Sequence, residues 1–299
     1  MSNTKLRSAK FSINELVKKN DNHSYASQAD MRHMLFRCIK DLHALGYKVG
    51  HIKGLQAKHI YALVDHWKSQ GKKPATIKNY MSKLRNTAAL LNNPKMVKPD
   101  NATYNIDKRS FKTGINKAIH HIDFSKCSDP HIRLSLEGQT LFGLRREESM
   151  KFILSEAHHG DVLKIMPSWT KGGRGRTLTI TSDAQRQWLQ KVAQLVQPGE
   201  SLIPQNRSYK QHLNHYEAEA KTMGVCKLHG LRHAYAQRRF RELTQSFDPH
   251  HQGLICPIDG GKTHNEMSNM EKMIDKRARL IISRELGHCR KNVTRAYLD

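Results

Sequence analysis

The stretch Leu286-Gly-His-Cys-Arg-Lys-Asn-Val-Thr-Arg-Ala-Tyr297 contributes most to predicting the fold of this 299-residue chain. It places His288 nine residues ahead of Tyr297. A tyrosine hydroxyl can attack a phosphorus atom and form a covalent ester when a base and positive charge lie beside it. The stretch therefore directs attention to cationic side chains elsewhere in the sequence.

Two arginine motifs precede this stretch. Gly143-Leu-Arg145 is followed three residues later by Glu148, and His229-Gly-Leu-Arg232-His233 comes later in the chain. A guanidinium binds phosphate oxygens through a forked pair of donors, which lysine cannot reproduce. Taken alone, Arg145 with Glu148 is more typical of a surface salt bridge. Arg146 adjoins Arg145, but the Gly-Leu-Arg order and the acid at the third following position favour Arg145.

The charge of the chain indicates a polyanionic partner. Lysine and arginine total 51 and aspartate and glutamate total 26, which gives a net charge of +25. No apolar run approaches the ~20 residues of a membrane span, and the polar first residues do not resemble a secretory signal. We therefore expect a nucleic-acid partner, no membrane, and a cytoplasmic, nucleoid-associated location.

The cysteines and histidines suggest neither a disulfide framework nor a metal centre. The five cysteines are scattered without CxxC spacing, as in a reducing compartment. The grouping of His250, His251, Cys256 and His264 matches no common zinc pattern, so solvated loop residues are the favoured interpretation.

The first part of the chain is predicted to be a basic helical domain. Residues 1–25 are polar with weak periodicity and are expected to form a flexible arm. Within residues 26–105, apolar side chains recur at helical spacing through 31–45, 55–67 and 77–91, the last after Pro74, a favourable first-turn residue. Residues 92–105 lack periodicity and are expected to be irregular and linker-like.

The second part is predicted to mix helices with a small sheet. Residues 106–121 are expected to be a linker region, with a short helix near 111–119, and residues 122–299 a second domain. Alternating residues 161–166 and 176–180 predict a β-hairpin whose turn is Thr170-Lys171-Gly-Gly-Arg174-Gly. A long loop is expected over 244–266. The predicted helices are 134–142, 182–196, 209–223, 229–243, 268–286 and 293–298.

Together these motifs resemble the tyrosine recombinases, also called phage integrases. The resemblance extends over about residues 27–299 and includes the helix that begins Pro74-Ala-Thr-Ile-Lys-Asn-Tyr. It implies a mainly α fold with a small β-sheet, in which an N-terminal helical, SAM-like core-binding domain precedes a mixed α/β catalytic domain. The matching motifs are Gly143-Leu-Arg145-x-x-Glu148, Thr170-Lys171-Gly-Gly, His229-Gly-Leu-Arg232-His233, Leu286-Gly-His288 and Tyr297.

The resemblance also implies an activity. The chain would be a site-specific DNA recombinase, or integrase, that cuts and rejoins strands through a covalent 3′-phosphotyrosine and needs no metal or other cofactor. Arg145 and Arg232 would bracket the scissile phosphate, and Lys171 would protonate the departing 5′ oxygen. The implied catalytic set is Arg145, Lys171, His229, Arg232, His288 and Tyr297, with Glu148 and His233 in supporting positions.

The histidine roles and the DNA contacts are less narrowly implied. His229 would take the tyrosine proton or donate to the phosphate, and His288 would donate to a phosphoryl oxygen. Basic side chains on the Pro74 helix and in the hairpin are expected to contact backbone phosphates, with a solvated face as the other interpretation for each. These side chains are Lys78, Lys83, Arg85, Arg174 and Arg176.

Two features depart from the family pattern. Residues 245–272 make the interval between Arg232 and His288 longer than usual, and few residues follow Tyr297, where relatives often donate a helix to a neighbouring subunit. The expected partners are double-stranded DNA and further copies of the chain, as a tetramer on DNA and a monomer when free. The alternatives are a type IB topoisomerase-like enzyme or hairpin resolvase, and a DNA-binding protein of the same fold that does not cut.

Overall fold

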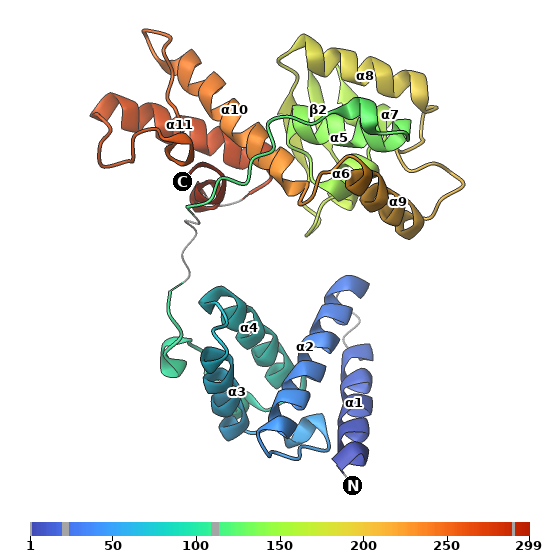
Figure 1. Cartoon of the computed structure of the whole chain (residues 1–299), viewed down its shortest axis with the longest axis vertical. Helices are drawn as coiled ribbons and strands as arrows, with labels where there is room; N and C mark the ends of the chain where they lie inside the picture. The colour runs from blue at the N-terminus through green and yellow to red at the C-terminus, as the bar shows by residue number, and fades with distance from the viewer. Residues whose placement is uncertain (1, 20–23, 109–113, 289–290) are drawn as a thin grey trace. The chain divides into compact units, whose positions relative to one another are not determined.

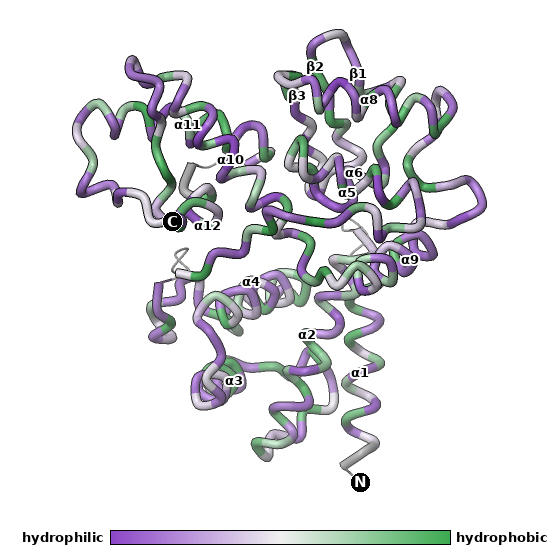
Figure 2. The backbone as a smooth tube through the Cα atoms, turned by 45° about the horizontal axis from the view of Figure 1, so that its top comes forward, coloured by the Kyte–Doolittle hydropathy of each residue, from purple (hydrophilic) through white to green (hydrophobic). Residues whose placement is uncertain are grey.

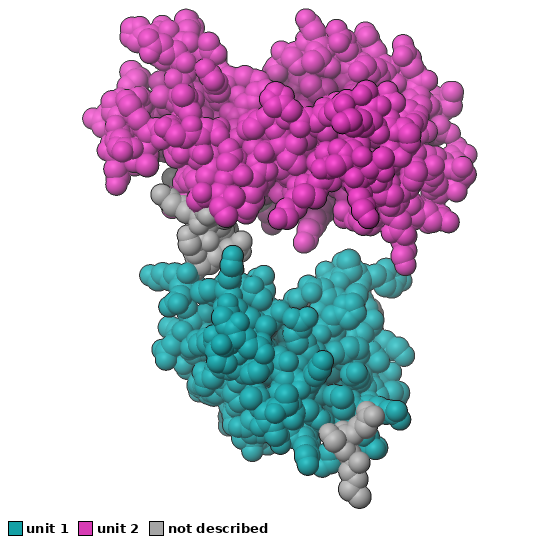
Figure 3. Space-filling view, viewed as in Figure 1, with its two compact units in different colours: residues 1–110 teal, residues 111–299 magenta. Residues whose placement is uncertain are grey.

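The chain divides into two compact units, Met1–Ser110 and Phe111–Asp299, coloured separately in Figure 3. The computed structural model describes residues 2–19, 24–108, 114–288 and 291–299. The boundary between the units falls within the predicted linker region, 106–121.

Unit 1 is a helical bundle around one apolar core (Figure 1). Hydrophobic and hydrophilic residues alternate along its helices (Figure 2). The hydrophobic ones are buried in the common core. Its helices are α1 (Ser2–Lys18), α2 (Tyr25–Ala44), α3 (Ala57–Ser69) and α4 (Pro74–Leu90), with 3₁₀ turns at Ile52–Gly54, Pro94–Met96 and Ala102–Tyr104.

The predicted flexible arm is wrong over α1, which is an integral helix of unit 1. Its Ala9, Ile13 and Val17 follow one another at intervals of four residues and are fully buried in the core. The hydroxyl of Ser12 also accepts a hydrogen bond from the backbone N–H of Ile52 at 2.9 Å. Three small or β-branched residues among polar and basic ones give a weak periodic signal, although each of them is buried.

The irregular segment 92–105 is also packed into unit 1, and so it is not a free linker. Arg85, on α4, donates to the carbonyl oxygens of Lys98 and Asp100 at 2.9 Å and to Oδ1 of Asn101 at 2.8 Å. Tyr104 is buried, and its hydroxyl accepts from the backbone N–H of Lys98 at 2.9 Å. Side-chain donors and acceptors therefore take the place of the regular backbone hydrogen bonds that this segment lacks.

Unit 2 combines helices with an antiparallel sheet of order β1-β2-β3, in which Leu163 pairs with Leu178. Among the described residues, no helix of either unit is both long and apolar enough to span a bilayer. The strands are β1 (His158–His159), β2 (Val162–Ile165) and β3 (Arg176–Thr179). The helices are α5 (Pro130–Phe142), α6 (Arg146–Met150), α7 (Leu154–Ala157), α8 (Asp183–Leu195), α9 (Tyr209–Thr222), α10 (His229–Phe247), α11 (Asn269–Glu285) and α12 (Arg295–Leu298). The 3₁₀ turns are Phe124–Lys126, Pro167–Trp169, Pro257–Asp259 and Lys291–Thr294.

Helix α5 is the central element of unit 2, because it is buried on two sides. Leu134 and Phe142 belong to the core formed with the sheet and α8, whereas Ile132 and Leu136 belong to the core formed with α9 and α10. The helix ends at Gly143, whose φ of +61° lets the chain turn sharply. Helices α10 and α11 pack side by side, with α12 against α10 (Figure 1). The chain segments that carry the sequence motifs therefore emerge from a rigid core.

The predicted hairpin and long helices of unit 2 agree with the structure within a few residues, but the helix near 111–119 does not. Residues 111–113 lie outside the described part, and residues 114–119 contain no helix. Instead, the N–H of Ile119 donates to the carbonyl of Gly230 at 3.0 Å. A Cβ at position 230 would lie 2.4 Å from the carbonyl oxygen of Lys117. Glycine at position 230 thus allows this segment to cross the beginning of α10.

Candidate active site

Arg145 is positioned by the acid predicted to hold it. Glu148 is 0% exposed and accepts from the backbone N–H of Arg145 at 2.8 Å and from its Nη1 at 2.6 Å. Nη2 of Arg145 donates to the carbonyl of Leu286 at 3.2 Å. Arg146 instead points to Glu217 on α9, at 3.0 Å. The structure thus brings Arg145, and not Arg146, to the other motif residues.

Arg176 was predicted to contact DNA phosphate at the surface, but its side chain lies in the interior of unit 2. Its side chain is 5% exposed, and Nη1 and Nη2 donate to the two carboxylate oxygens of Glu148 at 3.0 and 2.7 Å. Burial alone would raise the pKa of Glu148, but the hydrogen bonds and charges of Arg176 and Arg145 lower it to about 2. Arg176 is therefore a buried partner of a charged carboxylate, which corrects the predicted surface role.

Arg232 is almost completely buried, at 1% exposure, near the start of α10. Its terminal nitrogens donate to the carbonyl oxygens of Gly143 and Leu286, and its Nε has no hydrogen-bond partner among the described residues. Burial lowers the pKa of Arg232 to about 10, so the group stays protonated at neutral pH. Both predicted phosphate-binding arginines thus meet at one backbone carbonyl, that of Leu286.

Tyr297 lies beside His288, as their spacing in the sequence suggested. The tyrosine is 5% exposed, and its hydroxyl oxygen lies 3.2 Å from Nε2 of His288. Gly287 has a φ of +62° and lets the chain turn after α11, and the N–H of His288 then donates to the carbonyl of Ser283 at 2.8 Å. The end of α11 and the short helix α12 therefore position the two side chains together.

The protonation of His288 follows from its surroundings. Burial, followed by the charges of Arg232 and Arg145, lowers the pKa of His288 to about 4, so the ring is neutral at pH 7. Nη2 of Arg232, which can only donate, lies 3.5 Å from the same Nε2 atom. We infer that Nε2 is the unprotonated nitrogen and that the hydroxyl of Tyr297 donates to it.

The other two histidines lie around the tyrosine ring and not at its hydroxyl. The ring of His229 is exposed and lies 6.1 Å from that of Tyr297, centre to centre. His233 is buried, with its ring 4.5 Å from that of Tyr297. Burial and the neighbouring His229 lower the pKa of His233 to about 4, so it packs as a neutral ring. This geometry favours His288 over His229 as the acceptor of the tyrosine proton.

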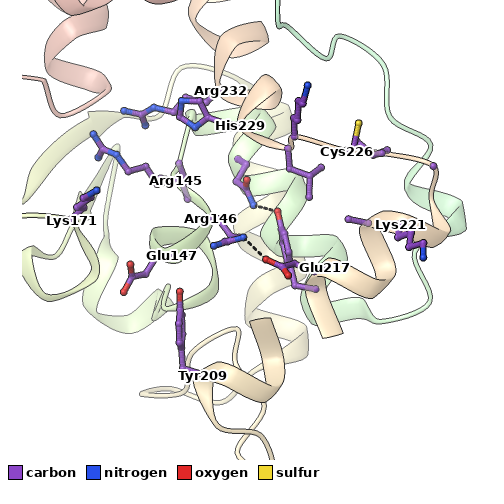
Figure 4. A pocket seen from close by; sticks show the side chains of 18 residues that line it. Arg145, Arg146, Glu147, Lys171, Tyr209, Glu217, Lys221, Cys226, His229 and Arg232 are labelled. Atoms are coloured by element: carbon purple, nitrogen blue, oxygen red, sulfur yellow. Dashed lines mark hydrogen bonds and ion pairs between the residues drawn. The ribbon is translucent and has the colours of Figure 1, made fainter. Parts of the chain in front are cut away.

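Lys171 lies at the edge of an open pocket of about 840 Å³ that also includes Arg145, His229 and Arg232. Figure 4 shows these four residues on one side of the pocket. The lysine is exposed, and Gly172 after it has a φ of +87°, which lets the chain turn between β2 and β3. The predicted proton donor thus faces the same space as the arginines.

The basic residues predicted on α4 have local partners in two of three cases. Lys83 pairs with Asp30 at 2.6 Å, and Arg85 holds the segment 92–105 as described above. Lys78 is partly exposed on the same helix. In unit 2, Arg174 is exposed in the turn that carries Lys171.

Sequence reasoning missed a chain of hydrogen bonds that reaches Tyr297 from the longer interval, 245–272. Asn116 donates from Nδ2 to Asp259 at 2.6 Å and accepts at Oδ1 from Nε2 of Gln237 at 2.9 Å. The same Nε2 donates to the carbonyl of Tyr297 at 3.1 Å. A glutamine in mid-helix and an asparagine in the irregular first segment of unit 2 carry no periodic or motif signal, so the sequence alone does not reveal this connection.

Two family models match the chain, one for each unit. The model described as "Phage integrase, N-terminal" matches residues 10–96, and the model described as "Integrase" matches residues 106–238. The second match ends before His288 and Tyr297, so the structure supplies their placement. No curated protein sequence gives a significant match.

Solved structures of recombinases share the fold over nearly the whole chain. The XerH site-specific recombinase bound to palindromic difH substrate, in a post-cleavage complex, is 13% identical with a TM-score of 0.56, covering 97% of this chain and 81% of that one. The Tn1549 transposon integrase in complex with a circular intermediate DNA is 10% identical with a TM-score of 0.55, covering 98% and 95%. The predicted fold, a helical SAM-like domain before a mainly α catalytic domain with a small sheet, is confirmed. With both units matched by integrase models and this fold throughout, the chain belongs to the phage integrase family of tyrosine recombinases, the enzymes of DNA recombination.

Proposed function

We propose that this recombinase cuts DNA with the hydroxyl of Tyr297 and holds the cut strand as a 3′-phosphotyrosine. The observation that carries the proposal is the convergence of one hydroxyl, one neutral imidazole and two guanidiniums on the end of α11. Tyr297 contacts His288 at 3.2 Å, and Arg145 and Arg232 both donate to the carbonyl of Leu286. Residues from just before α6, from α10, from just after α11 and from α12 are thus gathered where a single phosphate can bind.

The charge of the site suits a phosphodiester in its transition state. Arg145, Arg176 and Arg232 supply three positive charges, and Glu148 removes one. Guanidiniums held in a partly buried site stabilise the charge that develops on the non-bridging oxygens, and their fixed positions need little reorganisation. We assign the direct phosphate contacts to Arg145 and Arg232.

The proton transfers follow from the positions of His288 and Lys171. As the oxygen of Tyr297 forms its bond to phosphorus, the phenol proton passes to Nε2 of His288. The bond from phosphorus to the 5′ oxygen then breaks, and Lys171 gives that oxygen a proton. Attack by the 5′ hydroxyl of a second strand reverses these transfers. The aryl ester keeps the energy of the broken bond, so rejoining needs no ATP.

The proposed partners are double-stranded DNA and further copies of the chain. The net charge of +25 supports binding along phosphates, and Lys78 and Arg174 are proposed to make such contacts. Exchange of strands between two duplexes requires four active sites, so we propose a tetramer on DNA and a monomer when free. The mass of the protein in native gels, with and without its DNA site, tests this assembly.

Covalent capture on DNA tests the cleavage reaction. Sheared DNA from cells that carry the gene, including the flanks of the gene, is incubated with the protein, and fragments that survive hot detergent are sequenced. The expected result is one enriched sequence, attached through its 3′ phosphate to Tyr297, and no attachment with Tyr297→Phe. Attachment that persists in Tyr297→Phe would overturn the proposal.

The same experiment separates the alternatives. Retention of fragments only before detergent treatment would indicate a protein that binds DNA without cutting it. Covalent capture without sequence preference, together with relaxation of supercoiled plasmid, would indicate a topoisomerase-like enzyme.

A further inference from the structure

We propose that Arg176 is a positioning residue of the cleavage reaction, which acts through Glu148 on Arg145 and through the end of α11 on His288, and does not contact DNA. The inference rests on the proposed function of this site. By this inference, the first residue of β3 positions catalytic groups, whereas Lys171 in the preceding turn donates a proton.

The first step of the argument is the sharing of one carboxylate by two arginines. Glu148 is 0% exposed, and its Oε1 atom accepts from Arg145 at 2.6 Å and from Arg176 at 3.0 Å. Its Oε2 atom accepts from Nη2 of Arg176 at 2.7 Å and from the backbone of Arg145 at 2.8 Å. Arg176 thus donates to both carboxylate oxygens, and the side chain of Arg145 makes only one hydrogen bond to the same carboxylate.

The sharing of Glu148 by the two arginines determines the direction of the Arg145 guanidinium. The side chain of Arg145 is 26% exposed, whereas that of Arg176 is 5% exposed. Without Arg176, the carboxylate can take the guanidinium of Arg145 in a two-pronged pair, the preferred geometry for arginine and carboxylate. Arg145 would then turn toward Glu148 and away from a phosphate. The positive charge of the site would also fall by one.

The second step is the contact of Arg176 with the end of α11. Its Nε donates to the carbonyl of Glu285 at 2.6 Å, one residue before the carbonyl that receives Arg145 and Arg232. The approach depends on Gly287, because a Cβ there would lie 3.2 Å from Cδ of Arg176. One side chain of β3 therefore fixes the helix end from which His288 extends.

The third step is the position of Arg176 in the hairpin. It is the first residue of β3, five residues after Lys171, and it pairs with Ile165 at the end of β2. The hydrogen bonds of Arg176 therefore tie the base of the turn that carries Lys171 to Glu148 and to the end of α11. We infer that Arg176 sets the spacing between the proton donor and the phosphate-binding arginines.

A positioning role and a phosphate contact predict different measurements. A residue that contacts phosphate strengthens DNA binding and contributes about 0.9 to the slope of log K against log salt. A residue that only positions the catalytic groups leaves that slope unchanged and lowers the rate on bound DNA. Misplacement of a catalytic group by about 1 Å can reduce a rate on the order of 100-fold.

The experiment compares Arg176→Met and Arg176→Lys with wild type and with the control Arg186→Met. Arg186 is a half-exposed arginine of α8, paired with Asp161 and Asp183. The salt dependence of binding is measured on a short duplex of arbitrary sequence, and adduct formation in a single turnover is measured at saturating concentrations of a nicked duplex that carries the captured sequence. Thermal unfolding is recorded for every variant.

The expected result is an unchanged salt slope with an adduct rate reduced by about 10- to 100-fold in Arg176→Met. Arg176→Lys should not restore the rate, since an ammonium cannot fill both carboxylate oxygens. In the double variant Arg176→Met/Glu148→Gln, the loss should be smaller than the product of the two single losses, because both act through one pair. Arg186→Met should match wild type.

Two outcomes would overturn the inference. One is a reduced salt slope with a normal rate on saturating DNA, which would show a phosphate contact. The other is a normal rate in a folded Arg176→Met protein. If Arg176→Met does not fold, Arg176→Lys provides the test. A normal rate of adduct formation in Arg176→Lys would show that the two-pronged pair with Glu148 is not needed. A failure of the proposed function is distinguishable, because wild type would then form no adduct.

Discussion

Nε2 of His288 lies 3.2 Å from the hydroxyl oxygen of Tyr297 and 3.5 Å from Nη2 of Arg232. The imidazole therefore stands between the proposed nucleophile and a buried cation. This relationship makes the histidine a proton acceptor in the free protein, although the family resemblance led us to expect a donor to the phosphate. The two roles can follow one another, since an imidazole that has taken the phenol proton becomes a donor.

His288→Ala should slow adduct formation by about 10²- to 10⁴-fold, the usual contribution of a general acid or base. Rates on a nicked duplex of the captured sequence measure the effect, with His120→Ala as an exposed control. In wild type the rate should be nearly independent of this group above about pH 5 and fall as pH approaches about 4, because the neutral ring is then lost. An equal rate in His288→Ala would rule out the proposed proton transfer.

Glu148→Gln should lower the free energy of unfolding by about 3–5 kcal/mol, because it removes the buried charge that pairs with the guanidiniums of Arg145 and Arg176. Urea unfolding monitored by circular dichroism measures the loss. The adjacent Glu147→Gln is the matched control. Glu147 is half-exposed and pairs with Lys151 at 2.7 Å, so its loss should cost less than about 1 kcal/mol. Equal effects of the two changes would show that burial of Glu148 contributes nothing to stability.

His212→Leu should stabilise the protein by about 1–3 kcal/mol, the usual cost of a buried polar group that makes no hydrogen bond. His212 is completely buried on α9, and neither of its ring nitrogens has a hydrogen-bond partner among the described residues. Urea unfolding at neutral pH tests the change. A loss of stability would indicate that the ring fills its site better than an apolar side chain can.

The stabilising effect of His212→Leu should grow as the pH falls from about 6.5 to about 4. Burial lowers the pKa of His212 to about 4, so in this window the unfolded chain binds a proton that the folded protein excludes. Wild type therefore loses stability on acidification through this residue, and the variant does not. Unfolding curves at several pH values, compared with those of His120→Leu, isolate the contribution.

Gly230→Ala should destabilise unit 2 and slow cleavage, because the new Cβ would lie 2.4 Å from the carbonyl oxygen of Lys117. Either the segment 117–119 or the start of α10, which carries Arg232, must move, at a cost of about 1–3 kcal/mol. Gly54→Ala is the control, since its Cβ would meet nothing closer than 3.9 Å. Thermal unfolding and adduct rates measure both effects. An unchanged Gly230→Ala protein would show that the crossing segment yields freely.

The sequence was most informative where a residue's role depends on motif and spacing. Arg145, Arg232, His288 and Tyr297 come together in the structure: Arg232 lies near the start of the long helix α10 and His288 follows the long helix α11, whereas Arg145 and Tyr297 belong to short segments that only the motifs pointed out. The helix α1 was missed, since Ala9, Ile13 and Val17 form too narrow an apolar stripe among lysines to distinguish it from a polar arm.

Arg176 illustrates a second limit of sequence reasoning. The alternation of apolar and polar residues along a strand predicts which face of the sheet each residue occupies. The long side chain of an arginine at the edge of the core can still reach either a buried carboxylate or solvent. The choice depends on Glu148 and Glu285, which lie 28 and 109 positions away in the chain. Partners that far apart leave no local pattern.

The carbonyl of Leu286 accepts from both Arg145 and Arg232, and this has a consequence for how the enzyme tolerates mutation. The tether is main chain, so exchanging the leucine for another amino acid leaves the oxygen in place. This acceptor moves only with the backbone at the end of α11. A side chain at position 286 that still fits the core therefore leaves both guanidiniums with the same carbonyl in common.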